Sequence, residues 1–189
     1  MTERAAALPA EAEGLLDYWF GVLDEESWWR PTPAIDGEIH RRFFDLYEGI
    51  VRDGLPRGWL ASPRGRLAAI IALDQLPRNL HRDDARAFAS DDLALALARR
   101  AIEAGDEAAL DARERIFLYV PFEHCEDAGA QVQSVELYTA LGDEKCIEFA
   151  TMHQQIIERF GRFPHRNAAL GRETTAEEAD FLKGEALFW

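Results

Sequence analysis

Cysteine is scarce in this chain, and no metal-type spacing connects Cys125 with Cys146. This scarcity excludes a disulfide-stapled scaffold. Long apolar runs are also missing: the longest, LAAIIAL at 67–73, is too short to span a bilayer. The charged N-terminal segment lacks the apolar stretch of a signal peptide. We therefore expect a cytoplasmic protein with both thiols reduced.

Basic residues are outnumbered, with 21 lysines and arginines against 35 acids and a net charge of -14. Such a surface repels phosphate backbones, so nucleic acid and anionic membranes are excluded as expected partners. Two segments run against this balance. The first basic segment, 57–82, holds five arginines and one acid, and the second, 159–172, holds four arginines and no acid. Both segments need acidic partners or an anionic ligand.

No linker rich in proline, glycine or serine divides the 189 residues, so residues 1–189 are expected to form a single domain. Strand-type alternation is absent, and helical periodicity dominates. Short connections favour antiparallel neighbouring helices. The fold class is therefore all-α, built from antiparallel helix pairs. The expected helices cover 11–22, 33–53, 63–76, 91–105, 112–125, 127–141, 143–160 and 176–183.

Capping residues and prolines set several of these boundaries. Side chains that accept a hydrogen bond at a helix N-terminus precede four helices, at Ser62, Ser90, Asp111 and Thr175. Pro77 is expected to end the third helix, because the residue before a proline avoids helical geometry. Trp28 and Trp29 are expected in a loop.

Titratable side chains interrupt three apolar helix faces. Asp74 continues the face of Leu67 and Ile70. His124 and Asp127 continue a face on the helix that follows Asp111, and His153 interrupts the apolar face of the helix at 143–160. Buried carboxylates need partners. The neighbouring polar residues are expected to converge with them into one pocket. These residues are Gln75, Arg78, Asn79, Glu126, Arg162, His165, Arg166 and Asn167.

Three interpretations of this pocket stay open. Arginine recognises carboxylate and phosphate, which favours a binding module for a small anionic ligand or an acidic peptide. A hydrolase would use His124 or His165 as general base, with Asp127 orienting the imidazole and Arg78 and Arg166 holding the substrate. The third interpretation is a polar network that only stabilises the fold.

Other chemistry is less well supported by the sequence. Glu123, His124, Glu126 and Asp127 lie within five residues, yet they lack the HExxH spacing, so no metal and no other cofactor is expected. The aromatic segments at 18–20 and 28–29 fit the core better than a stacked ligand. The terminal segment with Leu187-Phe188-Trp189 is expected to fold back into a groove or to meet a second subunit in a homodimer.

Several long segments carry a family resemblance. They are YWFG (18–21), PRGRLAAIIALDQLPRN (63–79), RAFASD (86–91), ERIFLYVPFEHCEDAGAQVQSVELY (114–138) and IIERFGRFPHRNAALGRE (156–173). The chain resembles the bacterial family catalogued as domain of unknown function 924. The resemblance implies a tetratricopeptide-like right-handed stack of helix pairs around a concave face. It assigns no activity, but the polar residues named above for the pocket, with Asp74, His124 and Asp127, are the motif residues of that family.

Overall fold

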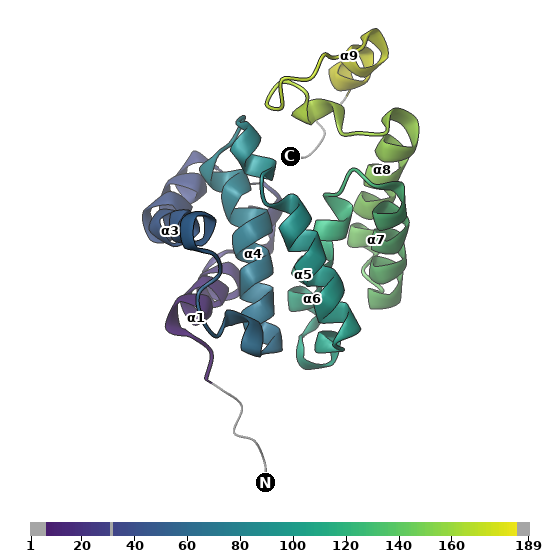
Figure 1. Cartoon of the computed structure of the whole chain (residues 1–189). Coiled ribbons are helices and arrows are strands. Elements are labelled where there is room, and N and C mark those ends of the chain that lie inside the picture. The colour runs from purple at the N-terminus through teal and green to yellow at the C-terminus, as the bar shows by residue number, and fades with distance from the viewer. Residues whose placement is uncertain (1–6, 31, 185–189) are drawn as a thin grey trace.

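The computed structural model describes residues 7–30 and 32–184, and every regular element within these ranges is helical (Figure 1). The all-α prediction is thereby confirmed. The α-helices are α1 (Ala10–Asp17), α2 (Glu25–Trp29), α3 (Pro33–Asp53), α4 (Pro63–Leu80), α5 (Asp91–Glu103), α6 (Ala112–Glu123), α7 (Ala128–Leu141), α8 (Glu144–Phe160) and α9 (Ala176–Lys183). The predicted role of Leu187-Phe188-Trp189 lies outside the described residues.

Shorter helical turns connect these helices: η1 (Tyr18–Val22), η2 (Trp59–Ala61), η3 (Ala85–Phe88), η4 (Asp106–Ala109) and η5 (Pro164–Arg166). η1 is a π-type turn, and the other four are 3-10 turns. Within the described part of the chain, no helix combines the length and apolar character needed to cross a membrane.

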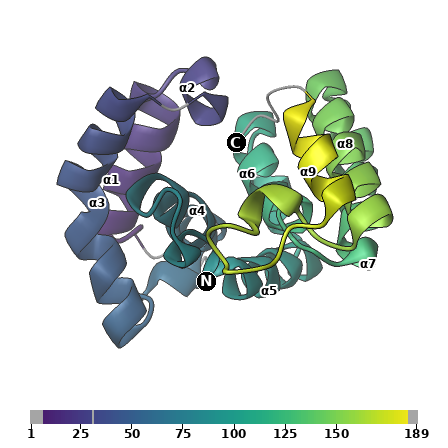
Figure 2. The same ribbon diagram turned by 90° about the horizontal axis from the view of Figure 1, so that it is seen from above.

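α4 lies at the centre of the molecule. It is buried on nearly all sides from Leu67 to Pro77, as expected of a helix that is apolar around its circumference. Figure 2 shows α1–α3 on one side and α7–α9 on the other, with α4–α6 between them. The chain therefore curves around a concave side, and the C-terminal ends of α4 and α6 reach that side.

Proline does not end α4 as the sequence predicts, because the helix continues through Pro77 to Leu80. Proline has no backbone N–H, so it cannot donate to the carbonyl of Leu73 one turn earlier. The hydroxyl of Ser90 donates to that carbonyl instead, at 2.6 Å. Ser90 thus occupies the N-cap position of α5 but makes no capping bond, and the extra turn of α4 carries Arg78 and Asn79 to the concave side.

The other predicted caps are present. Ser62 accepts from the backbone N–H of Gly65, and Asp111 and Thr175 each form a reciprocal capping box with a glutamate three residues later. The expected loop at Trp28 and Trp29 is wrong, because both belong to α2. This short helix forms because Asp24 accepts from the N–H of Ser27 at 2.8 Å.

Candidate functional site

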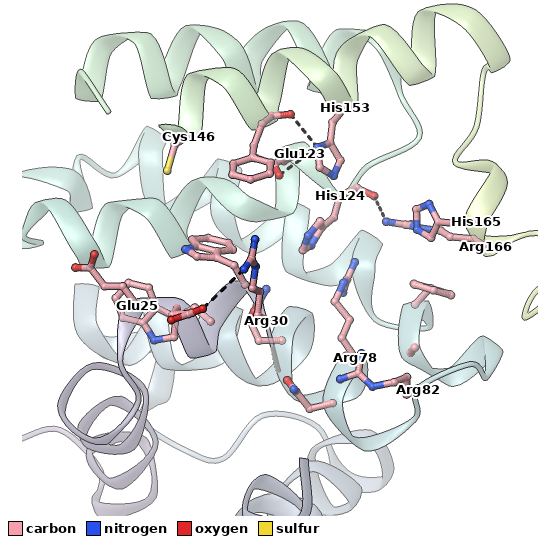
Figure 3. Close-up of a pocket in the computed structure, with 18 of the residues that line it drawn as sticks. Glu25, Arg30, Arg78, Arg82, Glu123, His124, Cys146, His153, His165 and Arg166 are labelled. Atoms are coloured by element: carbon pink, nitrogen blue, oxygen red, sulfur yellow. Dashed lines mark hydrogen bonds and ion pairs between the residues drawn. The ribbon is translucent and has the colours of Figure 1, made fainter. Parts of the chain in front are cut away.

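A cavity of about 710 Å³ opens on the concave side, and we call it the central cavity. Residues from α2, α4, η3, α6, α7, α8 and the region around η5 line it, so it gathers segments far apart in the sequence. Figure 3 shows Arg78, His124, His165 and Arg166 toward one side of it and Glu25 and Cys146 toward the other.

Two arginines on the basic side converge on one carboxylate. Arg78 donates to both oxygens of Asp91, from Nη1 at 2.8 Å and from Nη2 at 2.9 Å. Arg166 donates from Nη1 to Asp91 at 3.2 Å and from Nη2 to the backbone carbonyl of His124 at 2.9 Å. Asp91 stands in the first turn of α5, so it joins α4 to the segment after α8.

Aromatic rings hold the two guanidinium groups in place. The guanidinium carbon of Arg166 lies 4.6 Å from the ring centres of both Phe88 and Phe163, and Arg78 lies 5.7 Å from Phe88. Burial first, and then Arg78, lower the pKa of Arg166 to about 10, so it remains charged at neutral pH. Its Nε is buried and has no hydrogen-bond partner among the described residues.

His124 is held from behind by Asp74. Its Nδ1 lies 2.9 and 3.0 Å from the two carboxylate oxygens, and Asp74 is only 1% exposed. Gln75 donates to the same carboxylate at 2.6 Å, and Arg78 Nη1 lies 3.5 Å from it. Burial alone would raise the pKa of Asp74, but Arg78, His124 and Gln75 outweigh it and hold that pKa below its usual range.

Glu123, the residue before His124, lies in a more apolar part of the wall. One of its oxygens is 3.4 Å from Nδ1 of His153, which also lies 2.9 Å from the carbonyl of Phe149. Burial, together with the charge of Asp74, raises the pKa of Glu123 to about 8. Burial also lowers the pKa of His153 to about 3, so both side chains are neutral at pH 7.

The other side of the cavity is aromatic. Trp28, Trp29, Tyr138 and Phe149 line it with Cys146. Trp28 is fixed by a 2.8 Å hydrogen bond from its indole N–H to a backbone carbonyl. Burial raises the pKa of the Cys146 thiol, which therefore stays protonated and unreactive at neutral pH.

Six of the sequence-predicted site residues line the central cavity: Gln75, Arg78, Asn79, His124, His165 and Arg166. Asp74 lies behind them. Asp127 does not orient the imidazole, because its carboxylate accepts from the backbone N–H of Ala130 and caps α7. Arg166 contacts Asp91 and not Asp127 among the described residues.

Three further predicted residues stabilise the end of the chain. Arg162 donates to both oxygens of Glu178 at 2.6 and 2.9 Å, and Asn167 lies 3.3 Å from the same carboxylate. Glu126 accepts two bonds from Arg172 and one from the backbone N–H of Phe163. None of Glu126, Arg162 and Asn167 lines the cavity.

Sequence reasoning missed Asp91 and the aromatic side. An acid in the first turn of α5 is expected from the helix dipole alone, so Asp91 does not stand out as a site residue in the sequence. Its place at the end of the family segment RAFASD is the one sequence feature that indicates it. The sequence predicts Trp28 and Trp29 in a loop and as core residues, not as the wall of a cavity. Among the described residues, no group of three or more histidines, cysteines and acids lies close enough to hold a metal ion.

Comparison with known proteins identifies relatives by fold and family. No curated protein matches the chain. A solved structure of a protein of unknown function from Agrobacterium tumefaciens is 38% identical, with a TM-score of 0.85 over 92% of this chain and 97% of that one. The family model described as bacterial protein of unknown function (DUF924) matches residues 15–186. The chain belongs to this family.

Proposed function

We propose that the central cavity binds a small molecule that carries a carboxylate or phosphate group on an apolar, aromatic-sized body. A volume of about 710 Å³ falls within the range of ordinary small-molecule pockets. The basic side supplies directional donors for the anionic group. The aromatic side supplies flat apolar surface for the body of the ligand.

One observation carries the proposal: the Nε–Nη2 edge of Arg78 is incompletely used. The opposite edge, formed by Nη1 and Nη2, holds Asp91. Among the described residues, Nε makes no hydrogen bond and Nη2 donates only to Asp91, although Arg78 lines the cavity. Two parallel N–H groups on this edge match the two oxygens of a carboxylate or phosphate.

The local charges determine how an anion would be bound. Asp74 and Asp91 already balance Arg78 and Arg166, so the basic side carries little excess positive charge. Attraction at long range is therefore weak, and hydrogen-bond geometry decides affinity. We expect a carboxylate to be distinguished from its neutral amide, because only the carboxylate accepts both N–H groups.

A tetratricopeptide-like right-handed stack is part of the proposal. The packing of each of α3 to α8 against its neighbour supports it. Such stacks also suit acidic peptides, but residues of α2 and of η5 line the central cavity together, and its volume of about 710 Å³ favours a small molecule. The two free cysteines support a cytoplasmic location, and the net charge of -14 supports the exclusion of nucleic acid and anionic membranes.

Calorimetric titration and thermal melting with benzoate, its neutral isostere benzamide, and inorganic phosphate test this function. Arg78→Lys keeps the charge but removes the two-pronged edge, and we expect about a tenfold or greater loss of benzoate affinity. Arg100→Lys, on the exposed face of α5, is the matched control and should bind as wild type.

Benzoate or phosphate should raise the melting temperature of the wild type by mass action, and benzamide should not. An arginine network that only stabilises the helices predicts equal responses in the wild type and in Arg78→Lys. Equal responses to benzoate and benzamide would also contradict the proposal.

A further inference from the structure

The contact between Asp74 and His124 has a chemical consequence that binding alone does not need. Burial first, and then Arg78, lower the pKa of His124, against the opposing effect of Asp74. The imidazole is therefore neutral at pH 7. A neutral imidazole has one N–H, and an ionised carboxylate 2.9 Å from Nδ1 fixes that N–H there. The lone pair is left on Nε2.

Further contacts fix the backbone from which the ring projects. His124 follows the last residue of α6, its N–H donates to the carbonyl of Val120 at 3.0 Å, and its carbonyl accepts from Arg166. Its side chain is 16% exposed and lines the central cavity. Arg78 approaches the same carboxylate of Asp74 through Nη1, and Arg78 and His124 both line the central cavity.

We propose that His124 is a catalytic general base in the central cavity, positioned by Asp74, and that it hydrolyses an ester of a carboxylate-bearing substrate. This inference rests on the proposed function, because the basic side must hold the substrate's carboxylate. Asp74 is a positioning residue that fixes the tautomer and stabilises the imidazolium when it forms.

The step balances with water as the only co-reactant. His124 Nε2 accepts a proton from a water molecule while the water oxygen bonds to the acyl carbon. The carbonyl electron pair moves onto oxygen and then returns, breaking the bond to the leaving oxygen. The imidazolium gives its proton to that oxygen, so ester and water become acid and alcohol, and His124 is neutral again.

The probe is 4-acetoxybenzoate, which places a carboxylate on an aromatic body away from the reacting ester. Phenyl acetate is its neutral counterpart. We expect wild-type kcat/KM for the charged ester to exceed that for the neutral one by about tenfold or more. His124→Gln should lower kcat about 100-fold or more while benzoate affinity stays unchanged. His40→Gln, at an exposed position on α3, controls for adventitious imidazole catalysis and should match wild type.

Nitrogen NMR of the imidazole provides a readout independent of turnover. The wild type should show His124 neutral at pH 7 with its proton on Nδ1, and Asp74→Asn should shift the proton toward Nε2 and lower kcat more than it changes KM. Benzoate binding without His124-dependent hydrolysis overturns this inference and leaves the proposed function standing. A wild-type imidazole protonated on Nε2 also overturns it. If the wild type neither binds benzoate nor hydrolyses 4-acetoxybenzoate, both proposals are refuted.

Discussion

Two clusters of arginines and carboxylates in this protein use the same residue types for different ends. The cavity cluster consists of Asp74, Arg78, Asp91, His124 and Arg166, and the C-terminal cluster of Glu126, Arg162, Asn167, Arg172 and Glu178. In the C-terminal cluster, Glu178 accepts from Arg162 and from the backbone N–H of Thr175, which hold its pKa at about 2. The carboxylate of Glu178 therefore caps α9 and holds this helix against Arg162.

The cavity cluster differs because its unused hydrogen-bonding capacity belongs to arginines that line the cavity. Arg78 and Arg166 share one carboxylate, and the Nε of Arg166 is buried without a hydrogen-bond partner among the described residues. The C-terminal cluster also holds one unsatisfied atom, the side-chain oxygen of Asn167, but Asn167 does not line the cavity. The lesson is that unused donors on a cavity wall, more than the number of ion pairs, distinguish a candidate binding site from a structural brace.

The largest expected effect tests the shared carboxylate. Asp91→Ala leaves the buried charges of Arg78 and Arg166 without their common partner, and we expect a loss of about 3–5 kcal/mol in the free energy of unfolding. Urea denaturation measures it. Asp92→Ala is the control, because Asp92 occupies the same first turn of α5 but is exposed. Similar losses in both variants would mean that Asp91 stabilises the protein through the helix dipole and not through its contacts with Arg78 and Arg166.

The second prediction concerns pH and Glu123. Folding raises the pKa of this carboxyl from 4.5 to about 8, so the folded state binds the proton more tightly. Its stabilisation is complete below pH 4.5 and is lost as the pH rises toward 8, at about 1.4 kcal/mol per pH unit. Histidines whose pKa is lowered by folding add stability as the pH rises through 6.5, where the unfolded imidazoles lose their protons, so the contribution of Glu123 is measured as a difference from Glu123→Gln.

Urea denaturation at pH 6.5 and pH 8 checks this expectation. Relative to Glu123→Gln, which mimics the protonated acid and keeps the histidine contribution, the wild type should lose about 2 kcal/mol between the two values. An equal loss in both proteins would show that Glu123 is ionised in the folded state. The cavity wall would then hold a charge where its geometry indicates a neutral acid.

The third prediction tests how α4 passes Pro77. Ser90→Ala removes the hydroxyl that donates to the Leu73 carbonyl and should cost about 1 kcal/mol in urea denaturation. Ser90 also hydrogen-bonds Tyr47, so the single variant does not isolate this bond. In a Pro77→Ala background, position 77 regains its N–H and can serve the Leu73 carbonyl, so the same change should cost less. Equal costs in both backgrounds would exclude the compensation.

Pro77 also marks where prediction from sequence fails. Local rules predicted the caps at Ser62, Asp111 and Thr175, because a cap and its partner lie three residues apart. The compensation for Pro77 comes from a residue thirteen positions later, which no local rule contains. The sequence does not predict the short helix α2, because aromatic residues followed closely by two prolines resemble a loop.

The same limit applies to the site. Interrupted apolar faces indicated Asp74 and His124, since a polar residue on a buried helical stripe is visible in periodicity. The partner was not visible: the sequence predicts Asp127 as the carboxylate that orients His124, and the structure instead gives the contact to Asp74, 50 residues away. The role of Asp91 could not be predicted, because acids are common in the first turn of a helix and its position therefore gives no sign of a long-range contact.

The smallest expected effect tests whether the two clusters are independent. Glu126 lies between them, because it accepts from Arg172 and also from the N–H of Phe163, whose ring packs on Arg166. Arg172→Ala removes a partly exposed ion pair, so we expect a cost of about 0.5 kcal/mol or less in urea denaturation. Benzoate affinity, measured by calorimetry, should be unchanged, because the bond from Phe163 keeps Glu126 in place. Weaker benzoate binding in this variant would show that the C-terminal cluster positions Arg166, and the separation between structural brace and binding site would no longer hold.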